Sequence, residues 1–542
     1  MQTFKQRAEI GLSQPESWLY IILIVGGLLR LHQYLLDRSL WIDEAFLALN
    51  IIERSYSELL QPLAYNQAAP IGFLIIEKFM TQLWSSQEYA LRLLPFLASL
   101  SSLFLFFSIV KLIKIKPTAA AIALGLFALC DRLIYYSAEV KQYSTDVAVA
   151  LLLCWFTFHF KAHPPSKQQI LVFALVAALS VWLSHPAVFV IAGTGLCLIA
   201  FAVRQQPARL LGYLAAYGLC AVSFALFYQF SLSNLVGNSQ LQDSWGQSHN
   251  AFMPLPPTSL TELKWFFDTF FRFFNYPIGI ELTGVAAFGF IMGGIALFKR
   301  QKFTFWALIA PLVVTLLASG LQKYPFQGQL LLFAVPFALL IIAVGAQEII
   351  GRLQPANLLI PGLLILLLFS HPFYYAALNL NDPNSPPKFE YQRMREEIKP
   401  ALAYLKNHWQ AGDTLYVYYA AQHAFRYYAK QYGFDFATPR RPTGNYSGEW
   451  FEPALVSNPP QLIVGSVTRY ERDAFAADLR QLRQYPRVWL LFSHVRDRRS
   501  SIDEETVLLS LLSSAGQEVD SFHSLEAAVY LFNMNSNTDE TA

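Results

Sequence analysis

Long apolar segments recur along this 542-residue chain from about residue 17 to residue 376. Each is about 20 residues long, which is the length an α-helix needs to cross the hydrocarbon core of a bilayer. A backbone inside lipid has to satisfy its own hydrogen bonds, so segments of this length are expected to be helical. The sequence predicts eleven membrane spans, at about 17–36, 90–113, 117–135, 144–161, 168–185, 187–203, 209–230, 281–298, 303–320, 328–348 and 356–376.

The composition favours the same class of protein. Hydrophobic residues make up 54% of the chain and charged residues only 14%, whereas a soluble domain carries about 25% charged residues. The net charge of +3 is too small to indicate a nucleic-acid partner. We expect a polytopic α-helical membrane protein.

The short apolar segment at 70–84 decides the orientation of the spans. It carries Glu77 and Lys78 midway, so we expect an interfacial helix rather than a span. With eleven spans, the basic clusters of the short loops all fall on one side, from Lys5 and Arg7 onward, and basic loops mark the cytoplasmic face. The N-terminus is then cytoplasmic, and the outer face receives the loop around residue 43, the turn at 136–143, the loop at 231–280, the turn at 322–327 and everything after about 377.

The composition turns soluble after a Pro, Asn and Ser linker at 381–387. Short β-rich runs at 414–419, 462–467 and 487–493 alternate there with helical patterns at 421–432, 471–483 and 503–514. This alternation is typical of an α/β domain with a mostly parallel sheet. We expect two domains: a membrane domain over 1–380 and an extracytoplasmic α/β domain over 385–542.

Two adjacent carboxylates, Asp43 and Glu44, follow the first span. From Ala45 onward the apolar residues have the spacing of an amphipathic helix, which places Asp43 near a helix N-terminus, where backbone N–H groups favour an anion. Either Asp43 is a capping residue of an interfacial helix, or Asp43 or Glu44 is the catalytic acid/base of an enzyme that works at the lipid surface.

Further polar clusters lie at outer span ends. Glu139, Lys141, Tyr143 and Asp146 stand at the boundary of the third and fourth spans, where charges are costly unless they are paired or functional. Glu139 and Lys141 either neutralise each other or form part of a site.

Further residues expected on the outer face have both a structural and a functional interpretation. Lys323 and Tyr324 are either a snorkelling lysine with an interfacial tyrosine or ligands for a lipid phosphate. Arg92 either pairs with Glu88 or faces the site. His185, in a tight outer turn, is expected to be a turn residue rather than a ligand.

Three motifs carry a family resemblance: 41–45 (Trp-Ile-Asp-Glu-Ala), 69–70 (Ala-Pro) and 88–95 (Glu-Tyr-Ala-Leu-Arg-Leu-Leu-Pro). Together they resemble the N-terminal pattern of family-39-like membrane glycosyltransferases of the C type (GT-C). This class includes protein O-mannosyltransferases and the bacterial aminoarabinose transferase of lipid A. The stretches at 139–144 and 324–326 resemble later patterns of the family, and the resemblance covers roughly residues 17–376.

The resemblance implies a GT-C-like membrane domain that transfers a sugar from a polyprenyl-phosphate donor, with inversion, on the extracytoplasmic side of a bacterial plasma (inner) membrane. The acceptor is a lipid, a glycan or a protein. Asp43 takes the place of the first-loop acid, which activates the acceptor or binds a metal, and Glu139 that of the second-loop acid. Glu44 supports them, and a divalent metal ion would be held by Asp43 and Glu139.

The family often has arginine where this chain has Lys141 and Gln329. Lysine still binds phosphate as a point charge, whereas glutamine is neutral, so Lys323 is the expected substitute. The predicted ligands of the donor phosphate are Arg92, Lys141, Tyr143, Lys323 and Tyr324. The alternative is a polytopic lipid or glycolipid transporter or flippase without transfer chemistry, which normally places charges near the bilayer midplane. A membrane-anchored binding protein whose outer domain does the work is a third interpretation.

Overall fold

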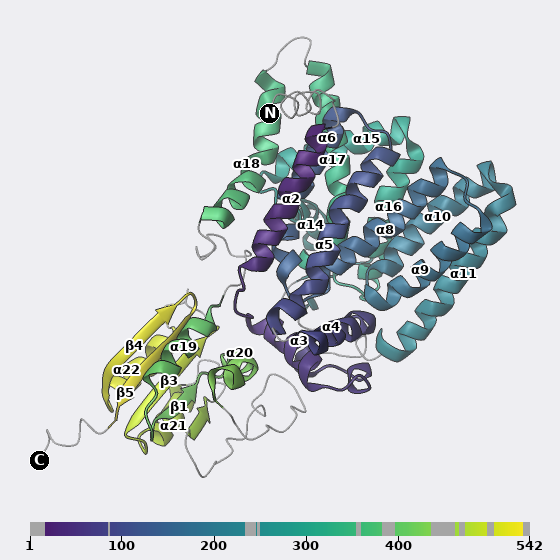
Figure 1. Ribbon diagram of the computed structural model, residues 1–542. Coiled ribbons are helices and arrows are strands. Elements are labelled where there is room, and N and C mark those ends of the chain that lie inside the picture. The colour runs from purple at the N-terminus through teal and green to yellow at the C-terminus, as the bar shows by residue number, and fades with distance from the viewer. Residues whose placement is uncertain are drawn as a thin grey trace, which may run out of the picture. The chain divides into compact units, whose positions relative to one another are not determined.

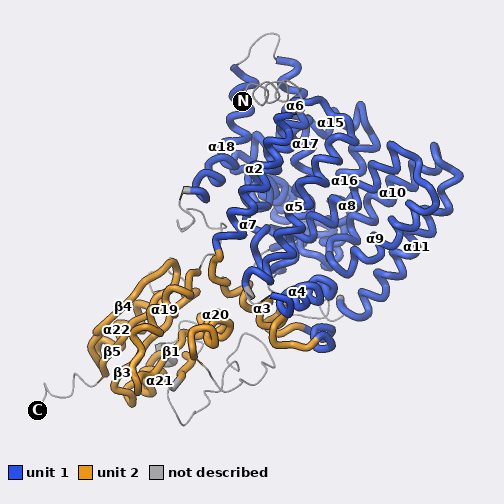
Figure 2. Tube along the Cα trace, viewed as in Figure 1, with its two compact units in different colours: residues 1–36, 56–62, 68–385 blue, residues 37–55, 63–67, 386–542 orange. Residues whose placement is uncertain are grey.

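The computed structural model describes residues 17–84, 87–232, 245–246, 250–353, 359–381, 396–434, 461–465, 472–495 and 503–534. The chain folds into two compact units (Figures 1 and 2). Unit 1 comprises Met1–Leu36, Tyr56–Pro62 and Ala68–Ser385, and unit 2 comprises Asp37–Ser55, Leu63–Gln67 and Pro386–Ala542. The predicted basic residues Lys5 and Arg7 and the linker from residue 382 onward lie outside the described residues.

Unit 1 is a helical bundle. Its longer α-helices are α2 (Ser17–Leu35), α4 (Ile71–Leu83), α5 (Gln87–Leu112), α6 (Pro117–Leu129), α8 (Tyr143–Ala162), α9 (Lys167–Leu183), α10 (Ala187–Gln205), α11 (Leu210–Phe227), α14 (Leu260–Asn275), α15 (Thr283–Arg300), α16 (Lys302–Gly320), α17 (Val335–Leu353) and α18 (Leu359–Asn381). Shorter helical pieces include α7 (Asp131–Tyr135), η1 (Glu58–Leu60), η3 (Tyr136–Ala138), η4 (Pro207–Arg209), η5 (Tyr228–Leu232) and η7 (Gly328–Ala334).

Each predicted span has a helix in the structure. Among the described residues, nine helices are long and apolar enough to cross a membrane, or ten if the bent pair of α6 with α7 and η3 counts as one span. The remaining predicted span is α9, an apolar helix of 17 residues. The expectation of a polytopic helical membrane protein is confirmed.

The helix α4 is too short to span a membrane, and it buries a carboxylate together with apolar side chains. Glu77 is fully buried inside unit 1, whereas Ile75, Phe79 and Leu83 form an exposed apolar stripe at intervals of four residues. Burial raises the pKa of Glu77 well above its usual value. An outward apolar stripe is what an interfacial helix presents to lipid.

Close contact of glycines joins α15 to α17. A Cβ on Gly293 would lie 1.8 Å from the carbonyl oxygen of Ile341, and one on Gly345 would lie 1.9 Å from that of Gly289. Gly289 and Gly293 stand four residues apart on one helix face, which is the small-residue spacing that lets membrane helices approach closely. The span containing α17 is the most buried of the bundle, so this crossing lies at its centre.

Unit 2 contains a five-stranded sheet with the strand order β2-β1-β3-β5-β4. Its strands are β1 (Thr414–Val417), β2 (Gln461–Val464), β3 (Arg487–Ser493), β4 (Gln517–Ser524) and β5 (Ala527–Asn533), and its helices include α19 (Ile398–His408), α20 (Gln422–Tyr428), η8 (Ala429–Tyr432), α21 (Arg472–Leu482) and α22 (Glu504–Ser513). β1 pairs in parallel with β2 and β3, as predicted, and Val417 stands opposite both Val464 and Leu491. β5 is antiparallel to β3 and β4, so the sheet is mixed rather than mostly parallel.

Most of the loop that follows α2, predicted to be the first outer loop, belongs to unit 2. Its helix α3 (Ile42–Glu53) packs against α20, and its short helix η2 (Ala64–Asn66) packs against α3. Asn50 joins α3 to η2, because its side chain donates to the carbonyl oxygen of Ala64 at 3.2 Å and accepts from the backbone N–H of Ala64 at 2.9 Å. Residues 37–55 and 63–67, which the predicted domain division assigns to the membrane domain, thus fold together with the sheet. The functional division near residue 380 stays a prediction.

Candidate functional site

The acid-bearing helix α3 begins one residue before Asp43. Its N-cap is Trp41, whose side chain makes no capping hydrogen bond, and two carboxylates stand in its first turn. Asp43 is half-buried and Glu44 is fully buried. Asp43 is therefore not the N-cap itself; it lies at the second helical position, where an anion is still stabilised by the helix dipole.

Gln67 orients the Asp43 carboxylate. Its Nε2 donates to Asp43 Oδ1 at 3.2 Å and also contacts the carbonyl oxygen of Tyr65 at 3.3 Å. The two residues before Gln67 have left-handed backbone conformations, with φ of 64° at Tyr65 and 51° at Asn66. Such conformations cost on the order of 1–3 kcal/mol and are often found at functional sites. The predicted motif at 66–70 thus contains a strained turn that brings Gln67 to the acid.

The second predicted cluster lies in unit 1 and is almost completely buried. The residues from Asp131 to Val147 are all buried, and Glu139 is 1% and Lys141 5% exposed. The backbone N–H of Lys141 donates to the carbonyl oxygen of Glu139 at 2.7 Å, which closes a tight turn between η3 and α8. Tyr143 follows as the first residue of α8. Sequestering an acid and a cation at the end of membrane helices is costly, as is expected for a functional site.

A chain of hydrogen bonds runs beside this turn. The hydroxyl groups of Tyr136 and Tyr276 are 2.7 Å apart, and the Tyr276 hydroxyl donates to Gln329 Oε1 at 3.0 Å. The Arg132 guanidinium stacks over the Tyr276 ring at 4.6 Å from its centroid. Burial raises the pKa of Tyr276, and the Arg132 charge opposes this shift. Gln329 thus serves as an acceptor for the hydroxyl group of Tyr276.

Tyr324 interacts with Leu330, Phe189 and the charge of Asp146. Its hydroxyl donates to the carbonyl oxygen of Leu330 at 2.9 Å, and its ring packs edge-to-face against Phe189 at 4.9 Å. Burial raises the pKa of Tyr324 well above its usual value, and the charge of Asp146 adds to the shift. Asp146 and Ser184 are both buried, and a side-chain interaction with Ser184 favours the charged form of the Asp146 carboxyl.

The remaining predicted residues are placed as follows. Lys323 is exposed, whereas its neighbour Tyr324 is half-buried. Arg92 is buried on α5, which packs against η3 and α8, and its charge reaches the Tyr34 hydroxyl. Burial lowers the pKa of His185 to about 4, so its imidazole is neutral at pH 7. His185 Nε2 has no hydrogen-bond partner among the described residues.

The structure therefore groups the predicted site residues in two sets. Glu139, Lys141 and Tyr143 lie together in unit 1, with Arg92 and Tyr324 in the same unit, whereas Asp43 and Glu44 lie in unit 2. The sequence analysis missed Arg132 and Tyr276. The only available signals were a charge pair after Cys130 inside an apolar segment and a Tyr-Pro turn at the end of an aromatic helix.

A metal ion has no complete ligand set within the described ranges. They contain no group of three or more His, Cys, Asp and Glu side chains that could hold one. The predicted ligands Asp43 and Glu139 belong to different units. No chemical step is therefore assigned to a metal, and the divalent ion stays a prediction.

The fold and the two clusters define the chain as a polytopic membrane protein with buried charges at the ends of its helices and an α/β unit. No protein-family model matches the sequence, and no curated protein does. Similar solved structures are those of ArnT from Cupriavidus metallidurans. The apo state has 14% identity and a TM-score of 0.49 over 96% of this chain and 98% of that one; the state bound to undecaprenyl phosphate has 12% identity and a TM-score of 0.49 over 95% and 98%.

An oligosaccharyltransferase from Archaeoglobus fulgidus has 13% identity and a TM-score of 0.43, with 79% of this chain and 61% of that chain covered. The arabinofuranosyltransferase AftD from Mycobacteria has 13% identity and a TM-score of 0.44, with 96% and 42% covered. These proteins are GT-C glycosyltransferases, the class that the N-terminal motifs resemble. At such identities and TM-scores, the function has to be derived from the residues of this chain.

Proposed function

We propose that this protein is a membrane glycosyltransferase that moves a hexosyl or pentosyl group from a polyprenyl-phosphate donor to an extracytoplasmic acceptor. The observation that carries the proposal is the burial of Glu139, Lys141 and Arg132 beside Tyr276 at the end of membrane helices. Buried cations in such a place suit a lipid-linked phosphate, whose charge they would neutralise. The family resemblance of the motifs at 41–45, 69–70 and 88–95 supports the same reaction.

The reaction breaks the bond between the anomeric carbon and the phosphate oxygen and forms a bond from that carbon to an acceptor oxygen. The phosphate leaves with the bonding electron pair, so preplaced cations stabilise its developing charge, and this electrostatic term is usually the largest in such catalysis. Lys141 and Arg92, both buried, supply these cations, and Tyr143 and Tyr324 supply hydroxyl donors. Lys323, which is exposed, meets the donor at the entrance.

Asp43 takes the proton of the acceptor hydroxyl, and a single displacement inverts the anomeric configuration. An ordinary aspartate has a pKa near 3.9 and is ionised at neutral pH, so its position makes it effective. Glu44 and Glu139 have supporting roles. If Asp43 instead binds a divalent metal together with Glu139, transfer is lost with a chelator and returns when the metal is added; transfer that is insensitive to chelator assigns Asp43 the role of base.

The protein lies in the inner membrane of a bacterium, with its N-terminus in the cytoplasm and the sheet of unit 2 outside. The basic residues of the short loops support this orientation, since such residues favour the cytoplasmic face. The acceptor is a lipid, a glycan or a protein.

The test uses the full chain in proteoliposomes with a panel of radiolabelled polyprenyl-phosphate sugars. Asp43→Asn is expected to abolish transfer. Asp268→Asn is the matched control, because this aspartate on α14 has a side chain that is 42% exposed and pairs with Lys264 at 3.9 Å. Full transfer by Asp43→Asn would overturn the proposal, as would movement of the lipid-linked sugar between leaflets without any transfer product, which is the behaviour of a flippase.

A further inference from the structure

The carboxyl ends of the parallel strands β1 and β3 meet at one edge of the sheet, where α/β folds commonly bind their ligands. In this chain a side-chain pair occupies that edge: His494, directly after β3, hydrogen-bonds through Nδ1 to the buried Glu396. The next residue, Glu397, turns to the first outer loop. Helix α20, which follows β1 at the same edge, also packs against that loop.

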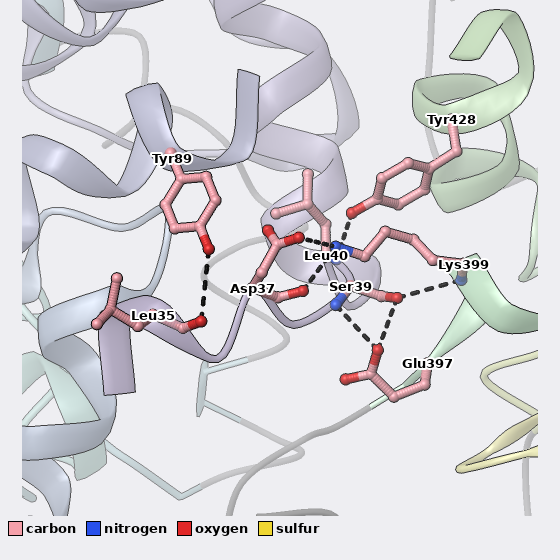
Figure 3. A network of polar contacts seen from close by, with 8 residues as sticks. All are labelled: Leu35, Asp37, Ser39, Leu40, Tyr89, Glu397, Lys399 and Tyr428. Carbon is pink, nitrogen blue, oxygen red and sulfur yellow. Dashed lines mark hydrogen bonds and ion pairs between the residues drawn. The ribbon is translucent and has the colours of Figure 1, made fainter. Parts of the chain in front are cut away.

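The N-terminal end of α3 is anchored by Glu397 and its neighbours (Figure 3). Glu397 Oε2 accepts hydrogen bonds from the backbone N–H of Ser39 at 3.1 Å and from its hydroxyl group at 2.9 Å. Tyr428 accepts from the backbone N–H of Leu40 at 2.9 Å. Lys399 Nζ pairs with Asp37 Oδ2 at 3.1 Å. The segment that leads into Asp43 is thus held by four side-chain contacts from the C-terminal part of the chain.

The C-terminal end of α3 is held by Arg426. Its guanidinium forms a bidentate ion pair with Glu53, with Nε donating to Oε1 at 2.9 Å and Nη2 donating to Oε2 at 2.8 Å. Nη1 lies 3.4 Å from the Tyr65 hydroxyl and so also reaches the turn before Gln67. Bidentate arginine–carboxylate pairs fix the relative orientation of the two side chains as well as adding binding energy.

An aromatic cluster fixes the middle of α3. Phe46 stacks on Tyr65 at 5.1 Å between ring centroids, and His423 of α20 meets both rings edge-on, at 4.6 Å and 5.1 Å. Phe46 lies three residues after Asp43, on the same side of the helix. A rotation or slide of α3 that moved Asp43 would therefore break this cluster.

We infer that the C-terminal sheet is a seat for the acid-bearing loop, and that Arg426, His423 and Glu397 are positioning residues for Asp43. The inference rests on the proposed function of Asp43. It gives the α/β unit a role in the transfer reaction itself, although none of its three positioning residues touches the reacting atoms. Misplacement of a catalytic group by about 1 Å can cost on the order of 100-fold in rate, so loosening either anchor has a measurable effect.

The experiment measures transfer by the full chain in proteoliposomes after loss of the Arg426 anchor. Arg426→Ala and Glu53→Ala are each expected to lower kcat by roughly 10- to 100-fold while the KM for the lipid-linked donor stays within about twofold. The double exchange Glu53→Arg with Arg426→Glu restores most of the lost kcat, because the pair is re-formed with reversed charges. Arg480→Ala is the control, since this arginine is exposed and its guanidinium donates to the carbonyl oxygen of Ala476 in its own helix at 3.3 Å.

Hydrogen exchange of the amides of α3 provides a readout that does not need activity. Faster exchange in Arg426→Ala, with the amides of β1 and β3 unchanged, supports the inference and excludes global unfolding. Arg426→Lys keeps the charge but loses the bidentate geometry, so the exchange rate of its α3 amides is expected to lie between those of the unchanged chain and Arg426→Ala. Unchanged kcat together with unchanged exchange of α3 would overturn the inference. An inactive Asp43→Asn would then still support the proposed function. If Asp43→Asn is fully active, the proposed function fails, and hydrogen exchange of α3 alone decides whether the sheet holds the loop.

Discussion

Gln67 Nε2 donates a hydrogen bond to Asp43 Oδ1 at 3.2 Å, across 24 residues of a loop that turns back on itself. The contact holds the Asp43 carboxylate in a defined orientation. A base has to meet its proton in a defined direction, so this hydrogen bond is part of the geometry that the reaction requires.

Removing the amide should therefore lower activity without unfolding the loop. Gln67→Ala is expected to reduce kcat about 10-fold, equivalent to ~1.4 kcal/mol, which is within the range for a hydrogen bond to a charged group. Gln67→Glu should cost more, because it places a second negative charge beside Asp43. The measurement is transfer from the radiolabelled donor, with the exposed Gln61→Ala as control. Equal activity of Gln67→Glu and the unchanged chain would contradict an orienting role.

Lys141 should matter for the phosphate of the donor. Lys141→Met removes a buried cation, and the expected loss is roughly 100-fold in kcat/KM, typical of losing one preplaced donor to a developing oxyanion. Lys141→Arg should keep most of the activity, because arginine is also a cation that binds phosphate. Lys264→Met is the control, since that side chain is 71% exposed. Transfer by Lys141→Met at the control's rate would remove Lys141 from the site.

The crossing of α15 and α17 predicts a strong asymmetry between two glycines of the same helix. Gly293→Ala forces a Cβ onto the backbone of Ile341, so the helices must separate, at a cost of about 1–3 kcal/mol. Gly284→Ala is the control, because a Cβ there meets nothing within 4 Å and alanine favours a helix. Thermal unfolding in detergent should show a clearly lower Tm only for Gly293→Ala. Equal Tm values would mean that the two helices are free to move apart.

Much of the fold could be predicted because its main signals are local. Each apolar segment is long and hydrophobic enough to cross the bilayer as a helix by itself, so each candidate span could be predicted from the sequence. Strand β4 was missed because Gln517–Ser524 is a polar, largely exposed edge strand with no apolar alternation. Because β4 was missed, the antiparallel pairing of β4 with β5, and hence the mixed character of the sheet, was missed as well.

The relationships within the site were harder to predict than its residues. Glu139, Lys141 and Tyr143 are visible because charges interrupt an apolar stretch. Tyr276 was missed because it ends an aromatic segment in which a tyrosine is expected for its affinity to headgroups. The anchoring of the first loop to the sheet had no local signal at all, since Ser39 and Glu397 are 358 residues apart.

His423 predicts how the stability of unit 2 depends on pH. Burial, followed by the charges of Arg426 and His494, lowers its pKa from 6.5 to about 3. Below pH 6.5 the unfolded chain takes up a proton at this residue, whereas the folded chain does so only near pH 3. The stabilisation is thus complete above pH 6.5 and is lost progressively as the pH falls toward 3.

Between pH 7 and pH 5 the loss attributable to His423 is about 2 kcal/mol, because 1.5 pH units below the unfolded pKa correspond to ~1.4 kcal/mol per unit. His423→Phe keeps an aromatic ring against Phe46 and Tyr65 but cannot titrate, so it should flatten the pH dependence by this amount. The free energy of opening, taken from hydrogen exchange of the β3 amides at pH 7, 6 and 5, measures the difference between the two chains. If both chains lose the same stability over this range, the imidazole is not held neutral by the loop, and the packing of α3 on α20 is looser than its ring contacts indicate.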